Sequence, residues 1–225
     1  MASPASDTTA PVAILGGTFD PVHYGHLRLG DEVRRALGLA RLRLVPAGDP
    51  PHRGGPRASA ADRLAMLKLA AEEFPGLVVD PREIERGGKS YTVLTLEELR
   101  REAPQRPLLL VVGADAFLGF PTWHRWRRIF DLAHVVVVAR PGVALAESLP
   151  PELRAQWLAR ITDDRSVLFS QPSGAIFEQP IAPQPISATQ IRAQLARGAG
   201  GLPDVVRLLP PAVLAYIDRH RLYSA

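Results

Sequence analysis

Residues 12–26 read VAILGGTFDPVHYGH, an apolar run followed by a glycine turn and two histidines. The run over residues 12–15 is continuously apolar, which is typical of a strand in a parallel sheet that is covered on both faces. Glycines directly after it let the backbone approach a ligand, and a helix that begins near His23 directs free N–H groups at the same point. The stretch therefore predicts a strand, a phosphate-binding turn and a helix in succession.

Short apolar runs alternate with amphipathic helical patterns along the rest of the chain. We expect strands at residues 12–15, 42–45, 77–79, 108–112, 135–139 and 167–169, and helices at about 24–37, 60–74 and 92–102. This alternation predicts an α/β fold: a doubly wound, Rossmann-like parallel sheet with helices on both faces and a small C-terminal helical region. The length of 225 residues suits one domain over residues 11–225, helical from about residue 187, after a flexible N-terminal tail at 1–10.

The composition, with 46% hydrophobic and 22% charged residues, is that of an ordinary globular protein. The sequence has no cysteine, which excludes disulfides, a thiolate nucleophile and cysteine-ligated metals and agrees with a cytoplasmic enzyme. Its apolar stretches are too short to span a bilayer. We therefore expect a cytoplasmic protein with no membrane partner.

The formal net charge is +4, yet the arginines are scattered along the chain and form no basic block. This pattern favours anionic small molecules over nucleic acid as partners. The only lysines are Lys68 and Lys89. Lys89 stands between Gly88 and Ser90, but position 83 is Glu83 and not glycine, so the sequence contains no complete GxxxxGK[ST] phosphate loop. Any phosphate must therefore be bound by other groups.

A second polar cluster lies near the C-terminus, where residues 185–192 read PISATQIR. A helix over about 188–196 would begin with Ser187 as its N-cap. Ser187 and Gln190 have the spacing of a capping box, which would account for both side chains without a ligand. Thr189 and Arg192 share one face of the first turn, and their hydroxyl and guanidinium groups predict a second anion site.

The segment at 46–57, PAGDPPHRGGPR, follows a predicted strand at its C-terminal end, where open α/β sheets bind ligands. A solvated crossover loop explains most of this segment. Arg53 is the residue in it that we expect to contact an anionic substrate.

The GGTFDPxHxGH pattern at 16–26, paired with ISxTxIR at 186–192, resembles the nucleotidyltransferase superfamily, and within it the bacterial nicotinate mononucleotide adenylyltransferases. Further segments are similar to that family: PPHR at 50–53, KSYTV at 89–93, GAD at 113–115, FPTWH at 120–124 and ARPG at 139–142. The likeness extends from about Pro11 to Tyr223.

This resemblance implies a reaction of NAD biosynthesis: transfer of the adenylyl group of ATP to nicotinate mononucleotide, giving nicotinate adenine dinucleotide (deamido-NAD) and pyrophosphate. It implies His23, His26 and Arg192 as catalytic residues. It implies an ATP site that comprises Gly16, Gly17, Thr18, Phe19, Gly25, Asp115, Ser187 and Thr189. Mg²⁺ would be carried mainly by the ATP phosphates, because this ion keeps several waters.

For the mononucleotide, the resemblance implies that Trp123 stacks on the pyridine ring and that backbone N–H groups around Thr92 and Val93 bind the ring carboxylate. His124 and Arg53 complete the implied substrate-binding set. Ala188 replaces a serine of many members, and His124 stands where an aromatic hydroxyl is common. Both departures bear on substrate preference and leave adenylyl transfer untouched.

Plainer interpretations stay open for several residues. His23 and His26 could be a zinc pair, although no third ligand is evident nearby. Either could also be a structural histidine. Trp126 is expected in the core, and Asp20, next to Pro21, is expected to form a turn.

Rival functions also stay open. They are a nicotinamide mononucleotide adenylyltransferase, a phosphopantetheine adenylyltransferase, a fragment of a class I aminoacyl-tRNA synthetase and a noncatalytic nucleotide-binding module. The sequence leaves open whether the protein is a monomer or a homodimer.

Overall fold

A computed structural model describes residues 10–51, 55–142, 145–181, 184–198 and 205–224. The predicted tail, except Ala10, and the predicted substrate contact Arg53 lie outside these residues. The chain divides into two compact units. Unit 1 comprises Met1–Ile14 and Thr92–Pro180, and unit 2 comprises Leu15–Tyr91 and Ile181–Ala225.

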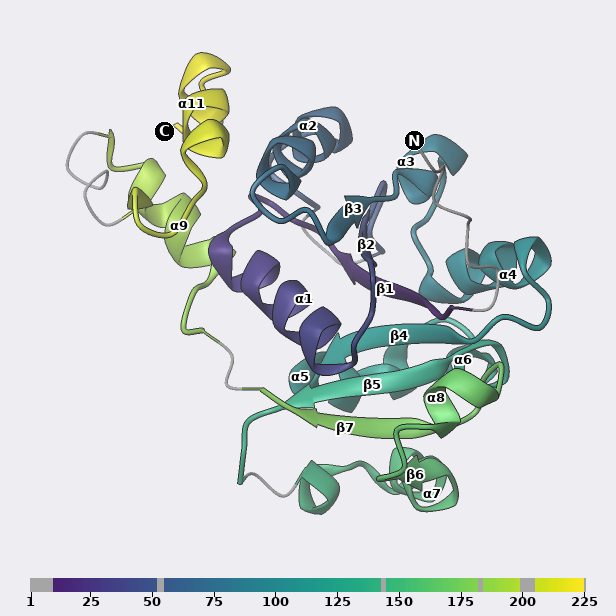
Figure 1. The fold of residues 1–225 in the computed structure, drawn as a ribbon. Helices are drawn as coiled ribbons and strands as arrows, with labels where there is room; N and C mark the ends of the chain where they lie inside the picture. The colour runs from purple at the N-terminus through teal and green to yellow at the C-terminus, as the bar shows by residue number, and fades with distance from the viewer. Residues whose placement is uncertain (1–9, 52–54, 143–144, 182–183, 199–204, 225) are drawn as a thin grey trace. The chain divides into compact units, whose positions relative to one another are not determined.

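The strands form a sheet in the order β3-β2-β1-β4-β5-β7-β6 (Figure 1). The pairings of β2 with β3, β4 with β5, β5 with β7 and β6 with β7 are all parallel. The first strand, β1 (Val12–Gly17), belongs to unit 1 up to Ile14 and to unit 2 from Leu15. The prediction of a Rossmann-like α/β fold with a parallel sheet is confirmed.

Unit 1 is built on two almost fully buried strands, β4 (Leu108–Gly113) and β5 (His134–Ala139). Continuous apolar runs such as the valines of β5 are expected where both faces of a parallel sheet are covered. The other strands of this unit are β7 (Ile176–Pro180) and β6 (Ile161–Thr162). Its helices are α4 (Thr92–Glu102), α5 (Ala114–Leu118), α6 (Trp126–Leu132), α7 (Pro151–Arg160) and α8 (Val167–Ser170), with short 3-10 turns η1 (Phe120–Thr122) and η2 (Leu145–Ser148).

Unit 2 contains the second half of β1 with β2 (Leu42–Pro46) and β3 (Leu77–Val79). Its helices are α1 (Tyr24–Ala36), α2 (Ala60–Ala71), α3 (Arg82–Arg86), α9 (Ala188–Leu195) and α11 (Pro211–Arg219). Helices α1 and α2 contact the strands β2 and β3. A Cβ at Gly30 would lie 3.3 Å from Leu77 Cδ2, so the glycine permits close packing of α1 on the sheet.

The first five predicted strands and the predicted helices are present, with ends that differ by up to three residues. The strand predicted at 167–169 is wrong, because these residues form helix α8. Asp164 forms a turn just before α8, since its Oδ1 accepts a hydrogen bond from the N–H of Ser166 at 2.9 Å. Strands β6 and β7 were not predicted.

Trp126 is buried, with 5% of its surface exposed, as predicted for a core residue. His134 is also fully buried in unit 1. Its Nδ1 accepts a hydrogen bond from the N–H of Ala175, and its Nε2 lies 2.8 Å from the carbonyl oxygen of Gln171. These two contacts satisfy both ring nitrogens, so His134 is a structural histidine. None of the described helices has the length and apolarity that a membrane span requires.

Candidate active site

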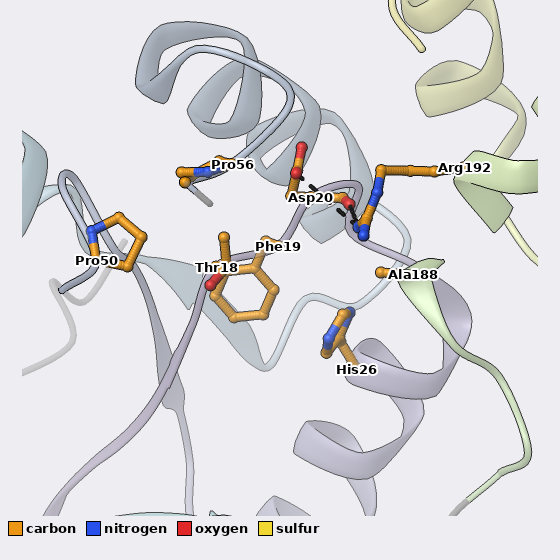
Figure 2. A pocket seen from close by; sticks show the side chains of 9 residues that line it. Thr18, Phe19, Asp20, His26, Pro50, Pro56, Ala188 and Arg192 are labelled. Atoms are coloured by element: carbon orange, nitrogen blue, oxygen red, sulfur yellow. Dashed lines mark hydrogen bonds and ion pairs between the residues drawn. The ribbon is translucent and has the colours of Figure 1, made fainter. Parts of the chain in front are cut away.

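A pocket of about 330 Å³ lies in unit 2 (Figure 2). Small-molecule sites typically measure about 300–1,000 Å³. The carboxyl ends of β1 and β2 lead into the two loops that form part of its wall, and helices α1 and α9 complete it. Its lining residues are Thr18, Phe19, Asp20, His26, Pro50, Gly55, Pro56, Ala188 and Arg192.

The two predicted histidines stack on each other at the start of α1. Their ring centroids lie 3.7 Å apart at an angle of 23°, and the rings of His26 and Phe19 form a T-shaped pair with centroids 5.1 Å apart. His23, the N-cap residue of α1, is only 4% exposed, whereas His26 reaches the pocket wall (Figure 2). The Nδ1 atoms of both rings are buried and have no hydrogen-bond partner within the described part of the chain.

Burial controls the charge of this pair. Desolvation lowers the pKa of His23 to about 4. Desolvation, together with the charge of His23, lowers the pKa of His26 well below its usual value. Both rings are therefore neutral at pH 7 before a ligand binds, and each can donate one hydrogen bond and accept another.

The glycines of the predicted turn have separate roles. A Cβ at Gly25 would lie 2.9 Å from Nδ1 of His23, and a Cβ at Gly17 would lie 3.0 Å from the ring of Phe19. These two glycines thus make room for the rings beside the pocket. A Cβ at Gly16 would meet no protein atom within 4 Å, so this glycine leaves open space next to the turn.

Arg192 connects helix α9 to the turn after β1. Its Nη1 donates to the main-chain oxygen of Asp20 at 2.6 Å, over a sequence separation of 172 residues. Its Nη2 donates to Oγ1 of Thr189 at 3.2 Å, so the predicted shared face of these residues is confirmed. Ser187 is the N-cap residue of α9, but its side chain makes no capping hydrogen bond. The capping-box interpretation therefore does not account for its hydroxyl.

Asp20 does more than form the predicted turn. Its carboxylate is buried and accepts hydrogen bonds from the N–H groups of Arg57 and Ala58, at 2.7 and 3.1 Å. It also accepts one from the hydroxyl of Tyr223 at 2.7 Å. Sequence reasoning missed Tyr223, since no local spacing links two residues that stand 203 positions apart.

Arg63 is a second residue that sequence reasoning missed. Its side chain is 1% exposed and donates to the carbonyl oxygens of Thr18, Ala47 and Gly48, at 2.8, 2.6 and 2.9 Å. Arg63 therefore fixes the backbone where β1 and β2 end. A signal existed in the sequence, because Arg63 precedes the core residue Leu67 by four positions and so lies on the buried face of α2.

The remaining predicted residues belong to unit 1, whereas every pocket-lining residue belongs to unit 2. Thr92 and Val93 begin helix α4, and Asp115 lies exposed in the first turn of α5. Trp123 is half-buried, with its ring centroid 4.6 Å from that of Phe120, and His124 is exposed. Their contacts with substrates stay predictions.

Comparison with known proteins identifies relatives over almost the whole chain. The model of a family described as "Cytidylyltransferase-like" matches residues 14–194. A "Probable nicotinate-nucleotide adenylyltransferase" of Acidithiobacillus ferrooxidans is 47% identical over 220 residues, covering 98% of this chain and 99% of that protein. A protein of the same name from Laribacter hongkongensis is 50% identical over 215 residues, covering 95% of this chain and 94% of that protein.

Among solved structures, the "Plasmodium falciparum nicotinic acid mononucleotide adenylyltransferase complexed with NaAD" matches with a TM-score of 0.69 over 95% of this chain and 97% of that chain. Its sequence identity of 15% shows the fold alone. The family, in contrast, is shown by the relatives with close to half of their residues identical over nearly full length. The chain therefore belongs to the cytidylyltransferase-like family and, within it, to the nicotinate-nucleotide adenylyltransferases.

Proposed function

We propose that this chain transfers the adenylyl group of ATP to nicotinate mononucleotide, and that the pocket of unit 2 holds the ATP triphosphate. One observation carries the proposal. A single pocket gathers the turn after β1, the imidazole of His26 and the guanidinium of Arg192, which stand far apart in the sequence (Figure 2). Each of these groups binds phosphate oxygens in other proteins.

The pocket offers donors that suit a polyanion. A guanidinium has five N–H donors, and the contacts of Arg192 with Asp20 and Thr189 leave further donors for phosphate oxygens. His26 adds the N–H of a neutral imidazole. Helix α9 begins at the pocket-lining residue Ala188, and the first N–H groups of a helix have no partner within it.

The reaction requires positioning and charge stabilisation more than proton transfer. The attacking 5′-phosphate has a second ionisation near pH ~6, so it is already an anion at neutral pH. We therefore expect no protein base and no covalent intermediate. The protein would hold the two polyanions in line for attack at the α-phosphorus, and Arg192 and His26 would stabilise the charge that develops on the departing pyrophosphate.

The side chains around the pocket are compatible with Mg²⁺ that is carried by the nucleotide and has few ligands from the protein. The acidic side chain in the lining is Asp20, and its oxygens already accept hydrogen bonds from Arg57, Ala58 and Tyr223. Within the described ranges, no three His, Cys, Asp or Glu side chains are grouped to hold a metal ion. When bound, Mg²⁺ would neutralise part of the phosphate charge, and its ligands would be mainly water molecules and phosphate oxygens.

For the second substrate, the residues of unit 1 have suitable chemistry. Trp123 is only partly buried, and its indole suits stacking on a pyridine ring. Helix α4 begins with Thr92 and Val93, and the first N–H groups of a helix, which have no partner within it, suit the ring carboxylate. The exposed carboxylate of Asp115 suits a ribose hydroxyl. A neutral amide would lose charge-assisted hydrogen bonds worth about 1.5–3 kcal/mol each, which favours the acid over nicotinamide mononucleotide.

The test is pyrophosphate release from ATP with nicotinate mononucleotide, with nicotinamide mononucleotide and phosphopantetheine as parallel substrates. We expect turnover with the acid, and turnover lower by about tenfold or more with the amide. His26→Ala should reduce turnover by orders of magnitude while the circular dichroism spectrum stays unchanged. ATP binding without turnover of any of the three substrates would contradict the proposal and favour a noncatalytic nucleotide-binding module.

A further inference from the structure

The C-terminal residues of unit 2 return to the turn after β1. Helix α11 contacts α2, and the chain after it reverses through hydrogen bonds from Arg221 N to Asp218 O and from Leu222 N to Ile217 O. Arg221 and Tyr223 have φ angles of 51° and 62°. Left-handed conformations are unfavourable for residues other than glycine and persist where the surroundings fix them. The reversal brings the hydroxyl of Tyr223 to Asp20.

The carboxylate of Asp20 distributes its hydrogen bonds unequally. Oδ1 accepts from the hydroxyl of Tyr223 at 2.7 Å and from Ala58 N at 3.1 Å, and Oδ2 accepts from Arg57 N at 2.7 Å. Arg192 stays 3.9 Å from Oδ2, although the main-chain oxygen of the same residue lies 2.6 Å from its Nη1. The buried carboxylate is therefore satisfied by neutral donors, and the guanidinium is not drawn into a close ion pair with it.

This arrangement matters because a carboxylate and a guanidinium readily form a bidentate ion pair, which would occupy the N–H donors that a phosphate needs. The hydroxyl of Tyr223 is a permanent donor: burial, followed by its hydrogen bond to Asp20, raises the pKa of this phenol far above its usual value. Tyr223 thus remains protonated at every pH at which the protein would work.

We infer that Tyr223 is a positioning residue for the triphosphate site: by donating to Asp20, it keeps Arg192 on the main-chain oxygen and leaves guanidinium donors available in the pocket. This inference rests on the proposed function, in which Arg192 binds the ATP phosphates. Tyr223 itself does not line the pocket. Its effect on ATP would pass through Asp20 and Arg192.

The test compares Tyr223→Phe with Tyr216→Phe, a matched control on α11. Tyr216 also donates its hydroxyl to a carboxylate, Asp62 at 3.0 Å, but this pair lies outside the pocket lining. Hydrogen bonds to charged groups change equilibrium constants by a factor of about ten to a hundred. We expect Tyr223→Phe to raise the Kd and the KM for ATP about tenfold and to leave the KM for nicotinate mononucleotide within about twofold. Tyr216→Phe should leave all three unchanged.

A double-mutant cycle then asks whether Tyr223 acts through Arg192. In an Arg192→Ala background, adding Tyr223→Phe should change the Kd for ATP less than about twofold. An equal loss of ATP affinity in both backgrounds, an ATP affinity of Tyr223→Phe equal to that of the unmodified chain, or an equal rise in the KM of both substrates would each overturn the inference. Because the Kd is measured by calorimetry without turnover, the cycle stays decisive if the unmodified chain binds ATP yet fails to adenylate nicotinate mononucleotide. That result would overturn the proposed function alone.

Discussion

The buried histidine pair makes the stability of the protein depend on pH. Burial lowers the pKa of His23 to about 4, whereas an unfolded histidine titrates at 6.5. Between these values the unfolded chain binds more protons than the folded one, so stability rises with pH and is lost as pH falls below 6.5. Above 6.5 both states are neutral at this site and the contribution is complete.

We therefore predict that His23→Asn flattens the acid limb of the stability curve. From pH 7 to pH 5, the titration of His23 should lower the free energy of unfolding by about 2 kcal/mol, and the variant should lack this part of the decrease. Denaturant unfolding of both proteins at the two pH values measures it. Carboxylates affect both proteins alike, so a decrease of the same size in both would show that His23 is not the source.

Gly25, in the first turn of α1, and Gly16, near the end of β1, should respond differently to substitution by alanine. Gly25→Ala places a methyl group 2.9 Å from Nδ1 of His23 and 3.3 Å from Cβ of Ile186. Relief of this overlap should cost about 1–3 kcal/mol, more than the gain in helix propensity, and should displace the imidazole. Gly16→Ala meets no protein atom within 4 Å, so stability should stay within about 0.5 kcal/mol.

Turnover separates the two variants further. We expect Gly16→Ala to raise the KM for ATP at nearly normal thermal stability, because its methyl group would enter the space we assign to the nucleotide. Gly25→Ala should lose stability and turnover together. Thermal unfolding and kinetics measured on the same samples would contradict this scheme if the stability losses were equal.

At the scale of elements, two arginines each donate hydrogen bonds to several carbonyl oxygens in the loops that follow or precede strands. Arg63 binds carbonyl oxygens after β1 and β2, at the edge of unit 2 that carries the pocket. In unit 1, Arg100 donates to the carbonyl oxygens of Arg106, Leu132 and Pro172, which precede β4, β5 and β7. A planar guanidinium reaches several carbonyls at once, whereas a lysine offers a single compact charge.

We predict that Arg63→Lys and Arg100→Lys both lower the free energy of unfolding, by about 2–4 kcal/mol, because buried carbonyl oxygens lose their donors. Only Arg63→Lys should also raise the KM for ATP at a temperature where both variants are folded. Equal effects on the KM from both substitutions would mean that Arg63 has no specific influence on the pocket.

The elements that the sequence predicts well are those with long, unmixed patterns. The valine run of β5 and the periodic helix α4 fall in this group. Strand β7 reads IFEQP and is largely half-buried, so its pattern is too mixed to distinguish from a loop. Residues 167–169 are apolar but too short to decide between strand and helix, and the turn at Asp164 makes them helical.

At the scale of the whole molecule, the sequence predicts residues that line the pocket better than the residues that hold those in place. The motifs at 16–26 and 186–192 are local patterns, and the structure brings His26 and Arg192 of these motifs into one pocket. Tyr223 leaves no comparable local motif, because its partner Asp20 stands 203 positions away in the chain. For Arg63 the helical spacing indicates a buried face, but it does not identify the carbonyl oxygens that the side chain contacts. Contacts fixed by topology alone are therefore the ones that sequence reasoning missed.

The assignment of substrates to residues leads to the final prediction. Trp123→Ala, in unit 1, should raise the KM for nicotinate mononucleotide about tenfold or more, because the indole ring that would stack on the pyridine is lost. The KM for ATP should change little. Steady-state kinetics with each substrate varied in turn measures both constants.

Trp126→Leu supplies the control, since Trp126 is a buried tryptophan of the same segment. It should lower thermal stability, through the lost packing against Phe130, without a selective change in either KM. If Trp123→Ala instead impaired only the use of ATP, the pyridine-stacking role would have to be abandoned. Adenylyl transfer itself would stand, because it is assigned to residues of the other unit.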